Sequence, residues 1–513
     1  MADGGMTRRV FIVAVGRTAS TASIFLVYAI LARAWPGEQF GVFSAVWVLG
    51  NTLVPFFLLG LPTGLLYFFP LRNRQSRQAL VFQAALCLAL SGVAAAVLLL
   101  SAGTRLASVF VGEGGAGPPG LTFEQYLIPF LPYVFSLVAG GYGESALVAA
   151  GRPTWQATLA FGTAIGVIGV ASTGALTGAS VPTVLWWLSA VGVTRMAISY
   201  WVVCRAVGVK NPLLPGVGVN CSVSPVAELV RYSLPIAAND GVGSLSRSVD
   251  RLVVLYFFST ETFGVYHVGA IEVPVALLLA SATTVLIPEV SRLYGEGRGD
   301  AIAALWKGAV GRLALITVPL FFFLFAFAGV IIGVYLPVSF ARSELVFRVF
   351  LLALPLRCAV YNPLLVGMGK AKWALWGGLG DLGLNFALSV IFVQLLLGER
   401  GSDLAMLGPA AATVLSTYLQ VGFLLLVIGH QLRRSPWELL PWARLLRVSA
   451  VSAAAGLIAL AGASPVDPPS LKLAVGALIF AAALLGSSRL CPQEREEVRA
   501  MLRSALKGGW GVK

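Results

Sequence analysis

The chain is dominated by apolar segments that are each long enough to cross a lipid bilayer. A membrane-spanning helix needs about 20 mostly apolar residues. Such segments fill most of the 513 residues, and we predict about fourteen of them. Their approximate bounds are 10–33, 40–69, 79–101, 122–150, 154–178, 183–207, 230–258, 263–290, 303–335, 344–369, 373–397, 404–430, 444–463 and 470–487. Because unpaired backbone groups are costly in lipid, we expect helices. The sequence therefore predicts an all-α polytopic membrane protein.

The balance of charged and apolar residues agrees with this fold class. Charged residues make up only 11% of the chain and hydrophobic residues 58%, whereas about 25% of the residues of a soluble domain are charged. Several predicted spans contain proline, among them Pro55, Pro129, Pro274 and Pro355. Since proline interrupts the helical hydrogen-bond ladder, we expect bent helices at these places.

The basic residues indicate how the chain is oriented in the membrane. Loops on the cytoplasmic side carry an excess of lysine and arginine. With the N-terminus inside, the inner segments collect 24 of the 36 basic residues, while the outer ones hold only Arg33, Arg105, Arg342, Arg400 and Lys472. This predicts a multi-pass protein of the cytoplasmic (inner) membrane with both termini cytoplasmic. It also accounts for the net charge of +14 without a nucleic-acid partner.

Cysteine and histidine give little sign of a cofactor. None of the five cysteines falls in a predicted outer loop, no CxxC pair occurs, and the only histidines are His267 and His430. We therefore predict neither a disulfide nor a metal site. No GxxxxGK[ST] motif is present, so we do not expect the chain to hydrolyse a nucleotide.

The two halves of the sequence repeat. EQFGVF at 38–43 matches ETFGVY at 261–266, offset by 223 residues, and GRPTW at 151–155 matches GKAKW at 369–373, offset by 218. Each half has six predicted spans and starts inside, so the repeats are parallel, as in transporters whose halves enclose the substrate. The predicted organisation is an N-terminal lobe at 1–208, a linker at 209–227, a C-terminal lobe at 228–431, and two further spans with a cytoplasmic tail at 432–513.

One predicted span carries four charges. Residues 234–258 are apolar enough to cross a bilayer, yet they include Asp240, Arg247, Asp250 and Arg251. A charge at membrane depth costs about 2.5–3.5 kcal/mol on insertion scales. On a continuous helix Asp240, Arg247 and Arg251 fall within one narrow arc. We interpret this arc as facing a polar central cavity. The alternative is a set of Asp–Arg pairs that lock helices together.

These same residues carry a resemblance to a known family. The segments LAR at 31–33 and GEQFGVF at 37–43 resemble the first inter-helix turn of polysaccharide flippases of the multidrug/oligosaccharidyl-lipid/polysaccharide (MOP) exporter superfamily. SRSVDR at 246–251 resembles the start of their second lobe. GMGK at 367–370, Asn385 and GPAAAT at 408–413 resemble their later helices. The likeness covers about residues 8–430 and consists of motifs that are weak singly.

The resemblance implies both a fold and an activity. It implies two six-helix lobes around a central cavity, a C-terminal helix pair, and alternating-access transport of an oligosaccharide linked to a polyprenyl phosphate carrier. The partners would be this substrate, membrane lipids, and the polymerase and glycosyltransferases of polysaccharide synthesis. The alternatives are a lipid II flippase of the same superfamily, a drug/cation antiporter, or an integral-membrane glycosyltransferase. Arg17 stands in the first span, where the drug-exporting branch often has an acid, which disfavours the antiporter.

The candidate site residues follow from the chemistry of such a substrate. Its phosphate must leave water, and arginine binds phosphate through a planar fork that stays charged. The candidate substrate-binding residues at membrane depth are Arg17, Arg195, Arg247, Arg251 and Arg357. For each of them, pairing with an intramembrane acid is the alternative. Asp240, Glu144 and Glu272 are candidates for coupling a proton or a sodium ion, with a plain salt bridge again the alternative.

The predicted topology can be tested by cysteine labelling. With both termini inside, cysteines substituted for Ser259 and Ser464 lie outside, and those for Ser76 and Ser435 lie inside. We expect an impermeant maleimide to label the first pair in intact cells and the second pair only after permeabilisation. The reverse pattern would contradict the orientation and the parallel repeat derived from it.

Overall fold

The computed structural model describes residues 3–110, 124–208, 223–271, 273, 276–359, 361–399 and 402–486, and all its regular elements in these ranges are helical. Most of the predicted linker at 209–227 and of the tail after residue 486 therefore lies outside the described residues. The chain packs as two compact units, residues 1–268 and 269–513. The lobes at 1–208 and 228–431, which follow from the repeat, stay a prediction.

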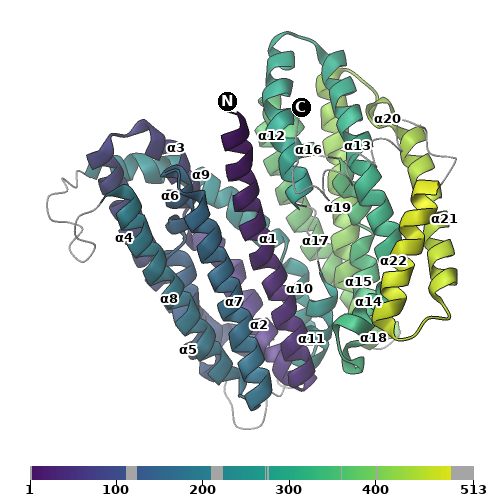
Figure 1. Cartoon of the computed structure of the whole chain (residues 1–513), viewed down its shortest axis with the longest axis horizontal. Helices are drawn as coiled ribbons and strands as arrows, with labels where there is room; N and C mark the ends of the chain where they lie inside the picture. Colours follow the sequence, from purple (N-terminus) through teal and green to yellow (C-terminus); the bar gives the residue numbers. More distant parts are fainter. Residues whose placement is uncertain are drawn as a thin grey trace. The chain divides into compact units, whose positions relative to one another are not determined.

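The first unit contains eleven described helices (Figure 1). They are α1 (Asp3–Ala34), α2 (Gly37–Phe57), α3 (Leu61–Leu71), α4 (Arg74–Phe110), α5 (Glu124–Ala139), α6 (Tyr142–Ala149), α7 (Pro153–Thr177), α8 (Val181–Val207), α9 (Val223–Ser246), α10 (Val249–Phe257) and α11 (Thr260–Gly269), whose last residue belongs to the second unit. Here α1 packs along α7, α5 packs between α4 and α8, and α9 packs on α2 and α3.

The second unit contains the remaining helices, drawn in green to yellow in Figure 1. They are α12 (Ala276–Gly295), α13 (Gly299–Ala326), α14 (Ala328–Tyr335), α15 (Ser343–Leu351), α16 (Tyr361–Gly367), α17 (Ala371–Glu399), α18 (Ser402–Ala405), α19 (Leu407–Leu432), α20 (Pro436–Leu439), α21 (Trp442–Ala463) and α22 (Pro469–Gly486), with 3₁₀ turns η1 (Val338–Phe340) and η2 (Leu354–Cys358). Its closest pairs are α17 with α19 and α21 with α22.

The all-α membrane class is confirmed, and the described residues hold eleven helical segments long and apolar enough to cross a membrane. The other three predicted segments, 10–33, 230–258 and 263–290, are mostly helical where described but are not among these eleven. In the first of them the residues whose side chains the structure describes include an apolar helix at 18–34. Fourteen spans therefore remain an expectation.

Several predicted spans are pairs of helices joined by a break, as proline and glycine led us to expect. The 40–69 segment breaks between α2 and α3 at Leu59 and Gly60, which both have positive φ, with Pro55 and Pro62 on either side. A left-handed backbone is easy for glycine because it lacks a Cβ. The 344–369 segment is interrupted by the 3₁₀ turn η2, which contains Pro355.

Burial separates helices that face protein from helices that face lipid. Within the most apolar stretch of α2–α3, 61% of the residues are buried, against 17% for α17 and 11% for α22. The α17 and α22 surfaces are rich in exposed leucine and phenylalanine, including Phe386, Leu395 and Leu478. Apolar surface on this scale suits a hydrocarbon solvent.

The two copies of the repeated motif pack against each other inside the first unit. A Cβ on Gly41 would overlap the carbonyl oxygen of Thr260, and one on Gly264 would lie 3.2 Å from the Cα of Gly41. The aromatic residues at equivalent positions, Phe40 with Phe263 and Phe43 with Tyr266, are all fully buried. Without side chains at the two glycines, the backbones of α2 and α11 approach closely.

This close approach predicts a large effect of a single methyl group. We expect Gly41→Ala to lower stability by about 1–3 kcal/mol, the usual cost of overpacking, because the Thr260 backbone must move. Gly162→Ala is the matched control, since nothing lies within 4 Å of a Cβ there. The measurement is thermal unfolding in detergent. Equal melting temperatures for the two variants would contradict the packing described here.

Candidate functional site

The charged stretch in the 230–258 segment lies at a helix break. Helix α9 ends at Ser246 and α10 begins at Val249, with Arg247 and Ser248 forming the turn. The prediction that Asp240, Arg247 and Arg251 share one arc of a continuous helix is therefore wrong. The helical periodicity that placed them together is interrupted at the turn formed by Arg247 and Ser248.

Three of the four charges in this segment remain accessible. Asp240 and Arg247 are exposed, and Arg251 is half-buried. The Arg247 guanidinium reaches back over its own helix, so that a Cβ on Gly243 would lie 3.4 Å from its Nη1. Arg251 Nη1 donates to the Arg247 carbonyl at 2.9 Å and so helps to satisfy the backbone of the break.

The fourth charge, Asp250, is buried. Its side chain is 2% exposed, and its Oδ2 accepts a hydrogen bond of 2.8 Å from the hydroxyl of Tyr266 on α11. The break itself is fixed by neighbouring hydroxyls: Thr52 Oγ1 and Ser248 Oγ lie 2.8 Å apart, and Ser244 Oγ donates to the Thr52 carbonyl. Buried polar groups with partners of this kind fix one packing arrangement.

A second group of candidates meets between α6 and α8. Arg195 Nη2 and Glu144 Oε1 form an ion pair at 2.6 Å, with side chains 24% and 38% exposed. Arg195 was a candidate for substrate binding, and Glu144 was a candidate for coupling a proton or a sodium ion. The structure brings them together as the salt bridge that was the alternative for each. Neither role is decided by the pairing alone.

The remaining candidates lie apart or lack described side chains. Arg357 is an exposed residue of the 3₁₀ turn η2. Arg17 lies on α1, but its side chain is outside what the structure describes, and Glu272 is outside the described residues altogether.

Sequence reasoning missed a polar cluster between α17 and α19. Ser416 Oγ donates to Asp381 Oδ1 at 2.8 Å, while Asn385 Oδ1 accepts from Thr413 at 3.2 Å and from Ser389 at 3.1 Å. Asn385 and Ser416 are buried. The available signal was the four-residue spacing of Asp381 and Asn385, which puts both on one helix face. Carboxylate, amide and hydroxyl oxygens together suit a hard cation.

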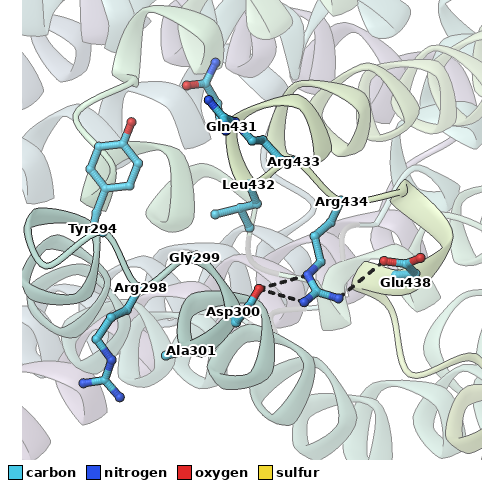
Figure 2. Close-up of a pocket in the computed structure, with 11 residues that line it drawn as sticks. Tyr294, Arg298, Gly299, Asp300, Ala301, Gln431, Leu432, Arg433, Arg434 and Glu438 are labelled. Carbon is cyan, nitrogen blue, oxygen red and sulfur yellow. Dashed lines mark hydrogen bonds and ion pairs between the residues drawn. The ribbon is translucent and has the colours of Figure 1, made fainter.

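A polar groove lies in the second unit where α12 and α13 meet α19 and α20, and its volume is about 1200 Å³. Figure 2 shows Arg434 between Asp300 and Glu438, to which it is paired at 2.7 Å and 3.5 Å. Asp300 raises the pKa of Arg434 through a hydrogen bond and charge attraction. The groove is formed at helix ends, and its central cation is already neutralised.

Among the described residues, no group of three or more His, Cys, Asp or Glu side chains could hold a metal ion. The described cysteines Cys87, Cys204 and Cys358 are free thiols.

Comparison with solved structures identifies the fold. The chain resembles a structure described as "Lipid II flippase MurJ, inward closed conformation" with a TM-score of 0.67 at 13% identity, covering 92% of this chain and 98% of that one. It resembles an inward-facing multidrug resistance MATE family transporter of the MOP superfamily with a TM-score of 0.65 at 14% identity, covering 82% and 98%. A MOP superfamily transporter from Pyrococcus furiosus gives a TM-score of 0.56 at 14% identity, covering 84% and 96%.

Sequence comparison finds one family model that matches part of the chain. No curated protein matches the sequence. Residues 155–343 match the model of a family described as "Polysaccharide biosynthesis protein", and this stretch includes the second copy of the repeated motif and the charged break between α9 and α10. The resemblance stated from the motifs agrees with both comparisons: residues 155–343 match the polysaccharide biosynthesis protein family, and the chain has the fold of the MOP superfamily structures.

Proposed function

We propose that this chain carries a lipid-linked oligosaccharide across the cytoplasmic membrane by alternating access. The observation that carries the proposal is the α9–α10 break, where Asp240 and Arg247 stay exposed within a segment that is otherwise apolar. Charges in such a segment are tolerated where they face water or a polar ligand. The polysaccharide biosynthesis family match supports a glycan as the polar part of the cargo.

Arginine is the appropriate residue for the anionic part of that cargo. A polyprenyl-linked sugar carries a phosphate or pyrophosphate, and the guanidinium binds it through paired hydrogen bonds. Arg247 and Arg17 are the first candidates because each lies on the helical segment that opens its predicted repeat. Arg251, Arg195 and Arg357 would contact the substrate at other depths of the pathway.

The coupling of transport to a cation is assigned to acidic residues in the membrane-spanning segments. Asp240, Glu144 and Glu272 are the proposed residues, and the cation is a proton or sodium. The Asp381–Asn385 cluster adds a second place where a cation would find oxygen ligands. One charge moving through 100 mV contributes about 2.3 kcal/mol, so a single coupled ion is enough to bias the transport cycle.

The remaining parts of the proposal concern the location of the protein, its partners and its architecture. The protein lies in the cytoplasmic membrane with both termini inside, among lipids, and receives its substrate from glycosyltransferases and delivers it to a polymerase. Two six-helix lobes around a central cavity, with α21 and α22 as the extra pair, are the architecture proposed for the cycle. A lipid II flippase is the second candidate, favoured by the coverage of the MurJ fold, 92% of this chain.

The proposed activity can be tested directly in proteoliposomes. A fluorescent polyprenyl-pyrophosphate oligosaccharide should become accessible on the opposite leaflet without covalent change. We expect Arg247→Ala to slow this transfer about 10- to 100-fold, the effect of losing a hydrogen bond to a charged group. Arg312→Ala is the control, because Arg312 is exposed and donates to the carbonyl of Gly308 in its own helix. A parent protein that modifies the lipid instead of moving it would point to an enzyme, and parent-like transfer by Arg247→Ala would remove its anion-binding role.

A charge swap separates the two roles open to Arg195. Either Arg195→Glu or Glu144→Arg leaves like charges facing each other, and we expect each to destabilise the protein by about 1–2 kcal/mol because the pair is partly exposed. The double swap should restore the melting temperature but leave transfer slow, since position 195 then carries the wrong charge for phosphate. Transfer at the parent rate by the double swap would show that the pair is purely structural.

A further inference from the structure

Helices α3 and α9 are fitted closely to each other. A Cβ on Gly60 would overlap the carbonyl oxygen of Ser233, and a Cβ on Gly64 would overlap the Ser233 hydroxyl. Gly60 has φ of +63°, a conformation that side chains disfavour. Ser233 is fully buried in this contact. The two glycines therefore form a seat into which one turn of α9 fits.

Beyond this seat, the end of α3 and the start of α9 are joined by side chains. Arg72 forms an ion pair with Glu228 at 2.5 Å. The rings of Tyr67 and Tyr232 stack with centroids 4.7 Å apart and planes 14° apart, and Phe68 meets Tyr232 edge-on at 5.3 Å. The Arg72 guanidinium also lies 5.9 Å from the Phe68 ring centroid. We call these five side chains the α3–α9 clasp.

The side chains of the clasp are partly exposed, whereas the contact between the repeated motifs is buried. At Gly41 and Gly264 backbone meets backbone in a fully buried region. In the clasp, the Arg72 and Glu228 side chains are 33% and 55% exposed, and Tyr67 and Tyr232 are 52% and 40% exposed. Half-exposed charges and tyrosine hydroxyls can be hydrated once separated, so the clasp can part without leaving a buried charge unpaired.

The position of the clasp indicates what a contact that can open and close would do in this protein. Helix α3 ends the first pair of helices in the first repeat, and α9 opens the second repeat. Both ends lie on the cytoplasmic side in the proposed orientation. We infer that the α3–α9 clasp is a releasable latch: closed, it holds the two repeats together at their inner ends, and it must open for a polar headgroup to enter from the inside. This inference rests on the proposed function.

The latch can be measured without substrate through the burial of Ser233. In a background in which every native cysteine is replaced by serine, a cysteine substituted for Ser233 reacts with N-ethylmaleimide only when α9 leaves its seat on α3. Arg72→Glu and Glu228→Arg should each raise the labelling rate about fivefold, because attraction becomes repulsion in a half-exposed pair. The double swap should return the rate to within about twofold of the parent.

A matched control is available one turn along α9. Arg231 is exposed, so Arg231→Glu makes the charge change of Arg72→Glu on the helix that carries Glu228, and it should leave labelling at the parent rate. Tyr232→Ala should raise labelling as the charge reversals do, because it removes the aromatic half of the clasp. Parent-rate labelling in both charge reversals, or a double swap as reactive as the single variants, would overturn the latch.

A cross-link relates the latch to transport. Cysteines at Arg72 and Glu228, joined by a short bis-thiosulfonate, should stop movement of the lipid-linked probe, and reduction should restore it. Transfer at the parent rate in the cross-linked protein would also overturn the latch. Failure of the proposed function is distinguishable, because in that case the uncross-linked parent moves no probe while the labelling changes are still observed.

Discussion

Every feature of this chain depends on the absence of water in the hydrocarbon core. A backbone group without a partner there costs several kcal/mol, so a span must be helical and any break must be covered by protein. The break between α9 and α10 meets this requirement with Arg251, which donates to the Arg247 carbonyl, and with the Thr52–Ser248 hydroxyl contact. The break between α2 and α3 meets it by lying against α9, with Ser233 filling the space that two glycines leave. Polar chemistry is thus confined to places where the helices are interrupted or paired.

Much of the fold could be predicted from the sequence because hydropathy and helix breaking are local properties. Apolar stretches of bilayer length predicted helices in the right places, and Pro55 and Pro355 indicated segments that are broken. The break after Ser246 could not be predicted, and the arc expected for Asp240 and Arg247 was wrong because it required the helix to continue past that residue. The turn there depends on contacts with Thr52, nearly two hundred residues earlier in the chain. A packing contact at that separation has no signature in local periodicity.

The sequence indicated the types of residue in the candidate site better than it indicated which of these residues pair with one another. Charge in an apolar segment singled out Arg195 and Glu144, but their pairing joins two helices about fifty residues apart. The pairing of Asp381 with Ser416 and of Asn385 with Thr413 was missed because serine and threonine are common in packed membrane helices and carry no charge to draw attention. Hydrogen-bond geometry, which only the fold supplies, distinguishes such a cluster from ordinary close packing.

The contact between Gly41 and Gly264 has a consequence for how the two halves of this chain can change. Duplicated segments ordinarily diverge independently, and these have done so at neighbouring positions, where Phe43 in one copy corresponds to Tyr266 in the other. At the two glycines each copy is the other's packing surface. A larger residue in either copy is therefore tolerated only with a compensating shift in the other. Independent divergence stops at this pair, and among relatives both positions should stay small.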